Sequence, residues 1–69
     1  MTSQANEEFY TLLGVRPDGV ASVVDLVAAA ELKLLHHKAE ALLDEHRSCE
    51  RVEIWRDGIL IDQFERAIA

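Results

Sequence analysis

Four side chains of this sequence have the chemistry of metal ligands, or of a nucleophile with its base: His36, Glu40, His46 and Cys49. If they lie on a helix, His36 and Glu40 share one face, because residues four apart lie one turn above each other. Imidazole, carboxylate and thiolate groups all bind zinc, and a neighbouring histidine can activate a cysteine thiol. The grouping therefore supports the hypothesis of a small metal- or thiol-dependent site.

The spacing of these residues also fits a purely structural interpretation. Zinc sites generally present tighter pairs of cysteine and histidine. A solvated helix face explains His36 and Glu40, and His46 suits the negative end of a helix. A cysteine such as Cys49, between a helix and a strand, is most often a small buried hydrophobic residue. We therefore predict no catalytic, cofactor-binding or metal-binding residues, and keep the metal or thiol site as the alternative.

The rest of the sequence also argues against an enzyme. The carboxylates show no pairing beyond ordinary surface charge, and only three glycines are present, so there is no glycine-rich phosphate loop. A chain of 69 residues rarely encloses a pocket of several hundred Å³. We expect a protein without enzymatic activity or cofactor.

The charge balance restricts the partners. The net charge is −6 and the seven basic residues are scattered, whereas nucleic acids and anionic membranes bind clustered Lys and Arg. No run of about 18 apolar residues is present to span a membrane, and the polar start of the chain does not resemble a signal peptide. With a single cysteine, no disulfide forms within the chain. We expect a soluble, cytoplasmic protein that binds neither nucleic acid nor membrane.

The dominant pattern is an apolar stripe at helical spacing, which predicts one long amphipathic helix over residues 22–47. Ser22 and Asp25 have the spacing of a capping box at its start. The residues on the stripe are Val24, Ala28, Leu32, Leu35, Ala39, Leu42 and Leu43. Val27 and Leu34 widen the stripe on one flank, so the apolar face exceeds what the rest of the chain obviously covers.

The N-terminal part is predicted as a flexible tail over 1–5, a short helix over 6–14 and a turn over 15–21. Asn6 suits the start of that helix and Gly14 its end, while Pro17-Asp18-Gly19 is a strong turn signal. The alternative is a strand over 9–15, which would complete a three-stranded sheet and weaken the case for a dimer.

Residues 8–18, EFYTLLGVRPD, resemble the start of a J-domain, whose first helix often ends in a similar Leu-Gly-Val before a turn. A J-domain stimulates its chaperone partner through a His-Pro-Asp tripeptide after its second helix, and this sequence contains no such tripeptide. The resemblance therefore implies a local helix followed by a turn, and no function is carried over from it.

Residues 51–65 predict an antiparallel β-hairpin around Asp57-Gly58, because β-branched and aromatic residues flank this turn pair. A two-residue turn pairs Trp55 with Leu60 but places Glu53 opposite Asp62, an unfavourable like-charge pair. A three-residue loop with a bulge avoids that contact. In either register Trp55 faces away from Val52 and Ile54.

Together these elements predict a single small α+β domain: a short helix, a long amphipathic helix and a C-terminal hairpin packed on it. Burial of a tryptophan contributes roughly 4–6 kcal/mol at about 25 cal/mol per Å². We therefore expect Trp55 to lie in an interface or under the N-terminal helix. The predicted interaction residues are Trp55, Leu60, Phe64, Val27 and Leu34. The sequence favours a small protein-interaction module that binds a protein partner or a second copy of itself, as a homodimer, without identifying the biological process.

Overall fold

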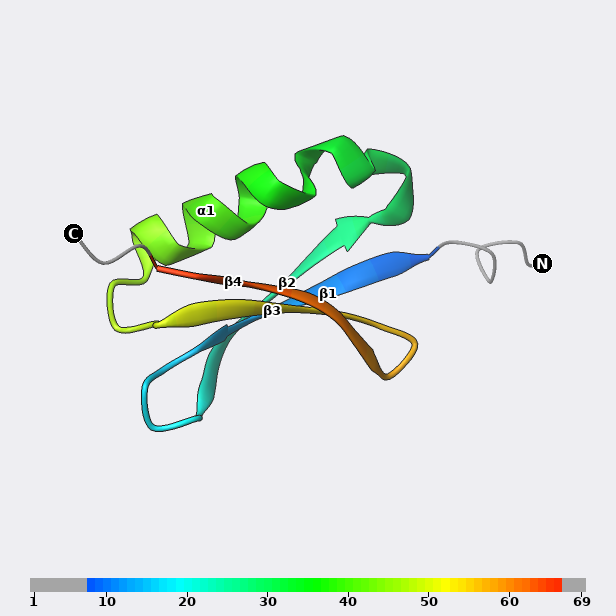
Figure 1. Cartoon of the computed structure of the whole chain (residues 1–69). Helices are drawn as coiled ribbons and strands as arrows, with labels where there is room; N and C mark the ends of the chain where they lie inside the picture. The colour runs from blue at the N-terminus through cyan, green and yellow to red at the C-terminus, as the bar shows by residue number, and fades with distance from the viewer. Residues whose placement is uncertain (1–7, 67–69) are drawn as a thin grey trace.

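The computed structural model describes residues 8–66, so the predicted tail over 1–5 lies outside the described residues. The elements follow one another as β1 (Phe9–Val15), β2 (Ala21–Ala28), the short 3-10 helix η2 (Ala29–Leu34), α1 (Leu35–Glu45), β3 (Arg51–Arg56) and β4 (Ile59–Glu65). The strands form a sheet, and the helical segment crosses one face of it (Figure 1). We call the face toward α1 the inner face and the opposite one the outer face.

The four strands form one antiparallel sheet in the order β2-β1-β3-β4, so β1 and β3 are central and β2 and β4 are the edges. The pairing aligns residues in rows that cross all four strands. One inner-face row consists of Asp25, Leu12, Ile54 and Asp62. Leu12 and Ile54 at its centre are fully buried, and the two aspartates lie at its ends on the edge strands.

The predicted fold class, a short helix and a long amphipathic helix with a hairpin packed on it, is wrong. Residues 9–15 form β1, as in the alternative strand interpretation, and not the end of a helix. The same strand replaces the helix that the J-domain resemblance implied. The predicted helix over 22–47 is divided between β2, η2 and α1. The antiparallel pairing within 51–65 is present as β3 and β4, but it forms half of a four-stranded sheet.

Strand β2 forms where the helical periodicity was misleading. Val23, Val24 and Val27 are β-branched, and such residues lose side-chain freedom in a helix but fit a pleated strand. Along β2 the burial alternates, so that Val27 is buried while Leu26 next to it is exposed. The capping-box spacing of Ser22 and Asp25 is a local signal, and pairing with β1 outweighs it.

Helix α1 corresponds to the last part of the predicted long helix, and it is built of good helix formers. Its buried residues are Leu35, Ala39, Leu42 and Leu43, which recur at spacings of three and four. They pack on an inner face whose buried residues are Leu12, Val27, Val52 and Ile54. Burial of each large aliphatic side chain contributes about 1.5–3 kcal/mol, so this layer is the main source of stability.

Gly14 lies within β1, where it allows a close approach rather than ending a helix. A Cβ atom at this position would lie 3.0 Å from the Cys49 Sγ and 3.2 Å from the Val23 Cβ. Cys49 is therefore packed directly over the glycine, where it is buried and lies 3.6 Å from the Ser22 Oγ. The strand accepts the cysteine because position 14 has no side chain.

The β3-β4 hairpin combines features of both predicted registers. Asp57 and Gly58 have φ values of 55° and 77°, as a two-residue turn requires, and Trp55 lies opposite Leu60. A bulge then shifts the register, so that Asp62 lies opposite Ile54 and Glu53 opposite Gln63. The bulge thereby avoids the like-charge pair between Glu53 and Asp62.

Arg66, just after β4, holds the C-terminal end of α1. Its Nη2 donates hydrogen bonds to the carbonyl oxygens of Leu43 at 2.6 Å, His46 at 3.2 Å and Cys49 at 2.8 Å. The last carbonyls of a helix have no partner within it, and no glycine follows this one to close it. The guanidinium group supplies the missing donors and ties the helix to the edge strand.

Candidate interaction surface

The outer face of the sheet is the candidate interaction surface of the described structure. The helical layer lies on the inner face alone, and within residues 8–66 no element covers the outer face (Figure 1). Antiparallel sheets often leave one face in solvent, but that face is then mostly polar. The composition of this outer face is therefore informative.

The pairing defines the rows of the outer face. The central row consists of Leu26, Thr11, Trp55 and Leu60, one residue from each strand. The next row consists of Val24, Leu13, Glu53 and Gln63, so Glu53 borders the apolar residues, and Phe9 lies beyond the central row on β1. Val24 is 64% exposed and Leu26 is 53% exposed, while Trp55 is half-buried. We call Phe9, Thr11, Leu13, Val24, Leu26, Trp55 and Leu60 the apolar patch; it contains no charged residue.

The charged residues of the outer face gather at one corner, formed by the ends of β3 and β4. Arg51 Nε donates a hydrogen bond to Glu53 Oε2 at 3.0 Å. The indole Nε1 of Trp55 donates to the other oxygen, Glu53 Oε1, also at 3.0 Å. Glu53 thereby orients the tryptophan ring on the sheet and satisfies its polar atom. A rigid aromatic side chain with its polar group satisfied is a typical anchor of a protein interface.

The five predicted interaction residues lie in three different places. Trp55 and Leu60 lie opposite each other in the apolar patch. Phe64 lies on the inner face, where its ring packs edge-on against His36 with 4.5 Å between the ring centroids. Val27 is only 2% exposed in the core, so it offers no surface to a partner. Leu34, at the junction of η2 and α1, is exposed and lines a groove beside α1.

The sequence interpretation missed Leu26, Val24 and Phe9 as surface residues. The signal that could have found them is the presence of aromatic and β-branched residues on both sides of the Pro17-Asp18-Gly19 turn, which is typical of a hairpin. Helical periodicity placed Val24 on a buried stripe instead.

The four residues of the alternative metal or thiol site do not meet at one place, although His46 and Cys49 are neighbours: the Cys49 amide donates to the His46 carbonyl oxygen at 2.9 Å. Cys49 is buried beside Gly14 and Ser22, whereas Glu40 is exposed on α1 and His36 packs on Phe64. Within residues 8–66 there is no group of three or more metal-capable side chains. In the described structure these four residues therefore do not form one cluster.

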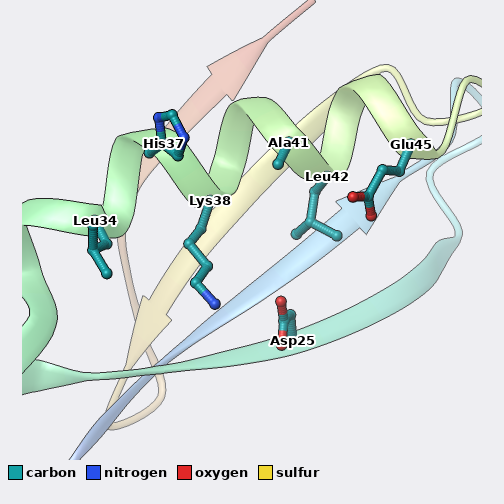
Figure 2. Close-up of a pocket in the computed structure, with 7 residues that line it drawn as sticks. All are labelled: Asp25, Leu34, His37, Lys38, Ala41, Leu42 and Glu45. Atoms are coloured by element: carbon teal, nitrogen blue, oxygen red, sulfur yellow. The ribbon is translucent and has the colours of Figure 1, made fainter.

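A groove of about 280 Å³ runs between α1 and β2. It is lined by Asp25, Leu34, His37, Lys38, Ala41, Leu42 and Glu45 (Figure 2). Asp25 rises from β2 toward the helix, while Lys38 and Leu42 descend from the helix toward the strand (Figure 2). The groove exists because α1 packs mainly over the central strands and leaves the inner side of β2 partly uncovered. Its lining mixes both signs of charge with small apolar patches, which does not define a particular ligand.

Comparisons with known proteins add no relative, because no family model, no curated protein and no solved structure matches this chain. In the part of the chain that the structure describes, none of the helices has the length and apolar character needed to cross a membrane.

Proposed function

We propose that this chain is a small non-enzymatic protein-interaction module that binds a second copy of itself through the outer face of its sheet. The observation that carries the proposal is the apolar patch, an uncharged cluster around Trp55 and Leu26 that no element of residues 8–66 covers. Exposed apolar clusters of this kind mark interaction sites.

The dimensions of the sheet support a modest interface. Four strands about 4.8 Å apart and about seven residues long, at roughly 3.4 Å per residue, span a footprint of about 450 Å². Two copies packed face to face would bury about 900 Å² by this measure, below the standard size of stable interfaces. The proposed dimer therefore has a dissociation constant in the micromolar range and exchanges with the monomer.

A second copy fits this surface better than a charged partner does. Each chain carries a net charge of −6, so two copies can approach only where the surface is free of like charges. The apolar patch is such a region, and beside it Arg51 and Glu53, at the charged corner of the outer face, already pair with each other. Two sheets packed face to face interdigitate their side chains at about 10 Å. Small domains also gain stability from a partner subunit.

The proposal places the protein in the cytoplasm, where a reducing environment suits a chain whose single cysteine is a buried free thiol. It assigns no cofactor and no nucleic-acid or membrane partner.

Two leucines of nearly equal exposure provide a matched test. Leu26 lies in the apolar patch and is 53% exposed, while Leu32 lies on η2 and is 55% exposed. We expect Leu26→Lys to abolish the dimer, because it places a charge in the centre of the interface, and Leu32→Lys to leave it unchanged. Sedimentation velocity over about 1 μM to 1 mM spans the expected affinity range.

Trp55→Ala serves as a second variant, because it removes the aromatic anchor without adding charge. Circular dichroism confirms that each variant is folded. A wild-type chain that stays monomeric over the whole concentration range contradicts the proposal. So does a dimer that Leu32→Lys dissociates and Leu26→Lys does not.

A further inference from the structure

Both edge strands of the sheet carry an aspartate at their centre, and the two make the same local contact. On β2, the backbone amide of Leu26 donates to the Asp25 Oδ1 at 2.8 Å. On β4, the amide of Gln63 donates to the Asp62 Oδ1 at 2.8 Å. The two aspartates end the same inner-face row, beyond the buried Leu12 and Ile54.

The register shows that both of these amides point away from the sheet. The backbone amide of Ala29 donates to the backbone carbonyl oxygen of Glu8 at 2.9 Å. The backbone amide of Arg66 donates to the backbone carbonyl oxygen of Glu50 at 3.0 Å. In an antiparallel ladder, residues bonded to the neighbouring strand alternate with residues whose amides point away. Leu26 is three residues from Ala29 and Gln63 is three residues from Arg66. Because three is odd, both amides belong to the outward-pointing set.

We infer that Asp25 and Asp62 block the two sheet edges against the addition of another strand. A strand that docks on an edge must bond its carbonyl oxygens to the outward-pointing amides. At Leu26 and Gln63 a carboxylate oxygen already accepts that hydrogen bond, so neither amide is free for an approaching carbonyl oxygen. This inference rests on the edge hydrogen bonds and does not depend on what covers the outer face.

Two further features of the edge strands agree with the inference. Each edge strand contains an irregularity in register, opposite Gly14–Val15 on β2 and opposite Ile54–Trp55 on β4. Bulges and inward-pointing charges are both devices that protect exposed sheet edges. Without protection, β2 is an eight-residue edge rich in valine, which favours strand pairing between copies.

The test compares three kinds of substitution: valine at the two edge aspartates, asparagine at the same two positions, and valine at a control position. Asp25→Val and Asp62→Val, singly and together, remove the carboxylate and leave the amides free. Asp25→Asn and Asp62→Asn remove the charge but retain a side-chain oxygen that accepts the same hydrogen bond. Asp44→Val is the matched control, because it makes the same aspartate-to-valine change at an exposed residue of α1, away from both sheet edges and from the outer face.

We expect the double valine variant to form larger species whose weight-average mass at least about doubles relative to the unmodified chain. Amide exchange should slow at Leu26 and Gln63 in these species, because the new strand protects both amides. The asparagine variants and Asp44→Val should keep the mass of the unmodified chain. Because that chain is the reference, the result is independent of whether it is a monomer or a dimer.

An unchanged mass for the folded double valine variant overturns the inference. Larger species in the asparagine variants would show that the charge of the aspartates, and not the occupied amides, protects the edges. That result would also overturn the inference. The same growth in Asp44→Val would show that added hydrophobicity alone is sufficient, with the same consequence.

Discussion

At the residue scale, Gly14 lies where Cys49 and Val23 leave no room for a side chain. Any side chain at position 14 must displace the cysteine sulfur or Val23, both in or beside the core. A strand glycine normally weakens a sheet, so its presence here follows from this close approach.

We predict that Gly14→Ala lowers the free energy of unfolding by about 1–3 kcal/mol, because the new methyl group overpacks the site. Cys49→Ala removes the sulfur and should reverse part of that loss, so the double variant is more stable than the sum of the two single changes implies. Urea denaturation of all four proteins in this double-mutant cycle measures the coupling. Strict additivity of the two losses would contradict the proposed contact.

The turn between β1 and β2 contains the residues whose titration the structure perturbs. A side-chain hydrogen bond from Arg16 lowers the pKa of Asp18 below its ordinary value, and the Val20 amide, which donates to the Asp18 Oδ1 at 3.0 Å, lowers it further. The folded turn thus favours the carboxylate. Its contribution is fully present above the ordinary pKa of Asp18 and is lost as the pH falls through the lowered pKa.

We predict that Arg16→Ala raises the pKa of Asp18 toward its ordinary value, because the first cause of the shift is removed. Carbon-detected NMR of the Asp18 carboxyl group across the acidic range measures the midpoint directly. Lys33→Ala, which removes a cation on η2, is the control and should leave the midpoint in place. Both groups of the Arg16–Asp18 pair are exposed, so the change in overall stability should be small.

At the element scale, the C-terminal end of α1 depends on a residue outside the helix. We predict that Arg66→Ala destabilises the fold by about 1.5–3 kcal/mol, because hydrogen bonds to the carbonyls of Leu43, His46 and Cys49 are lost together. Amide exchange should accelerate more in the last turn of α1 than in the strands of the sheet. Arg47→Ala changes an exposed arginine near the same helix end and should have little effect. Equal losses for the two variants would mean that general charge effects, rather than the carbonyl contacts, stabilise the helix end.

The sequence predicts these elements only where local signals and pairing agree. The Asp57-Gly58 turn and its β-branched flanks identify the residues of β3 and β4, and the stripe at Leu35, Ala39 and Leu42 identifies α1. Over residues 22–28 the two kinds of signal conflict. The helical periodicity and the capping-box spacing favour a helix there, whereas the three valines and pairing with β1 favour the strand.

Of the candidate surface, only the half formed by β3 and β4 was predictable from the sequence. The alternation around Trp55 shows that it faces away from Val52 and Ile54, and its register places Leu60 opposite. The other half of the apolar patch comes from β1 and β2. Leu26 and Val24 are surface residues only because β2 is a strand, so they could not be identified while that segment was assigned to a helix. The outward direction of edge amides likewise requires the register itself.

At the scale of the whole molecule, charge and apolar surface oppose each other in the proposed dimer. Two chains of net charge −6 repel at long range, while the apolar patch attracts only at contact. We predict that salt strengthens the dimer, because the Debye length falls from roughly 30 Å at about 10 mM to about 8 Å at 150 mM. Sedimentation equilibrium at the two ionic strengths measures the change. A dimer that salt weakens would point to an interface formed by ion pairs instead.

The strand order also has a consequence for how the chain folds. β1 and β2 are joined by a short turn. The other neighbour of β1 is β3, which begins at Arg51 and follows the helical segment along the chain. The β1–β2 hairpin can form early, yet Leu12 has no covering layer until the second half of the chain docks. Because contacts between residues distant in sequence are slow to form, the joining of β1 to β3 should limit the folding rate. Until β3 docks, the free edge of β1 has no central aspartate to block strand addition. Incorrect strand pairing is therefore most favourable during folding.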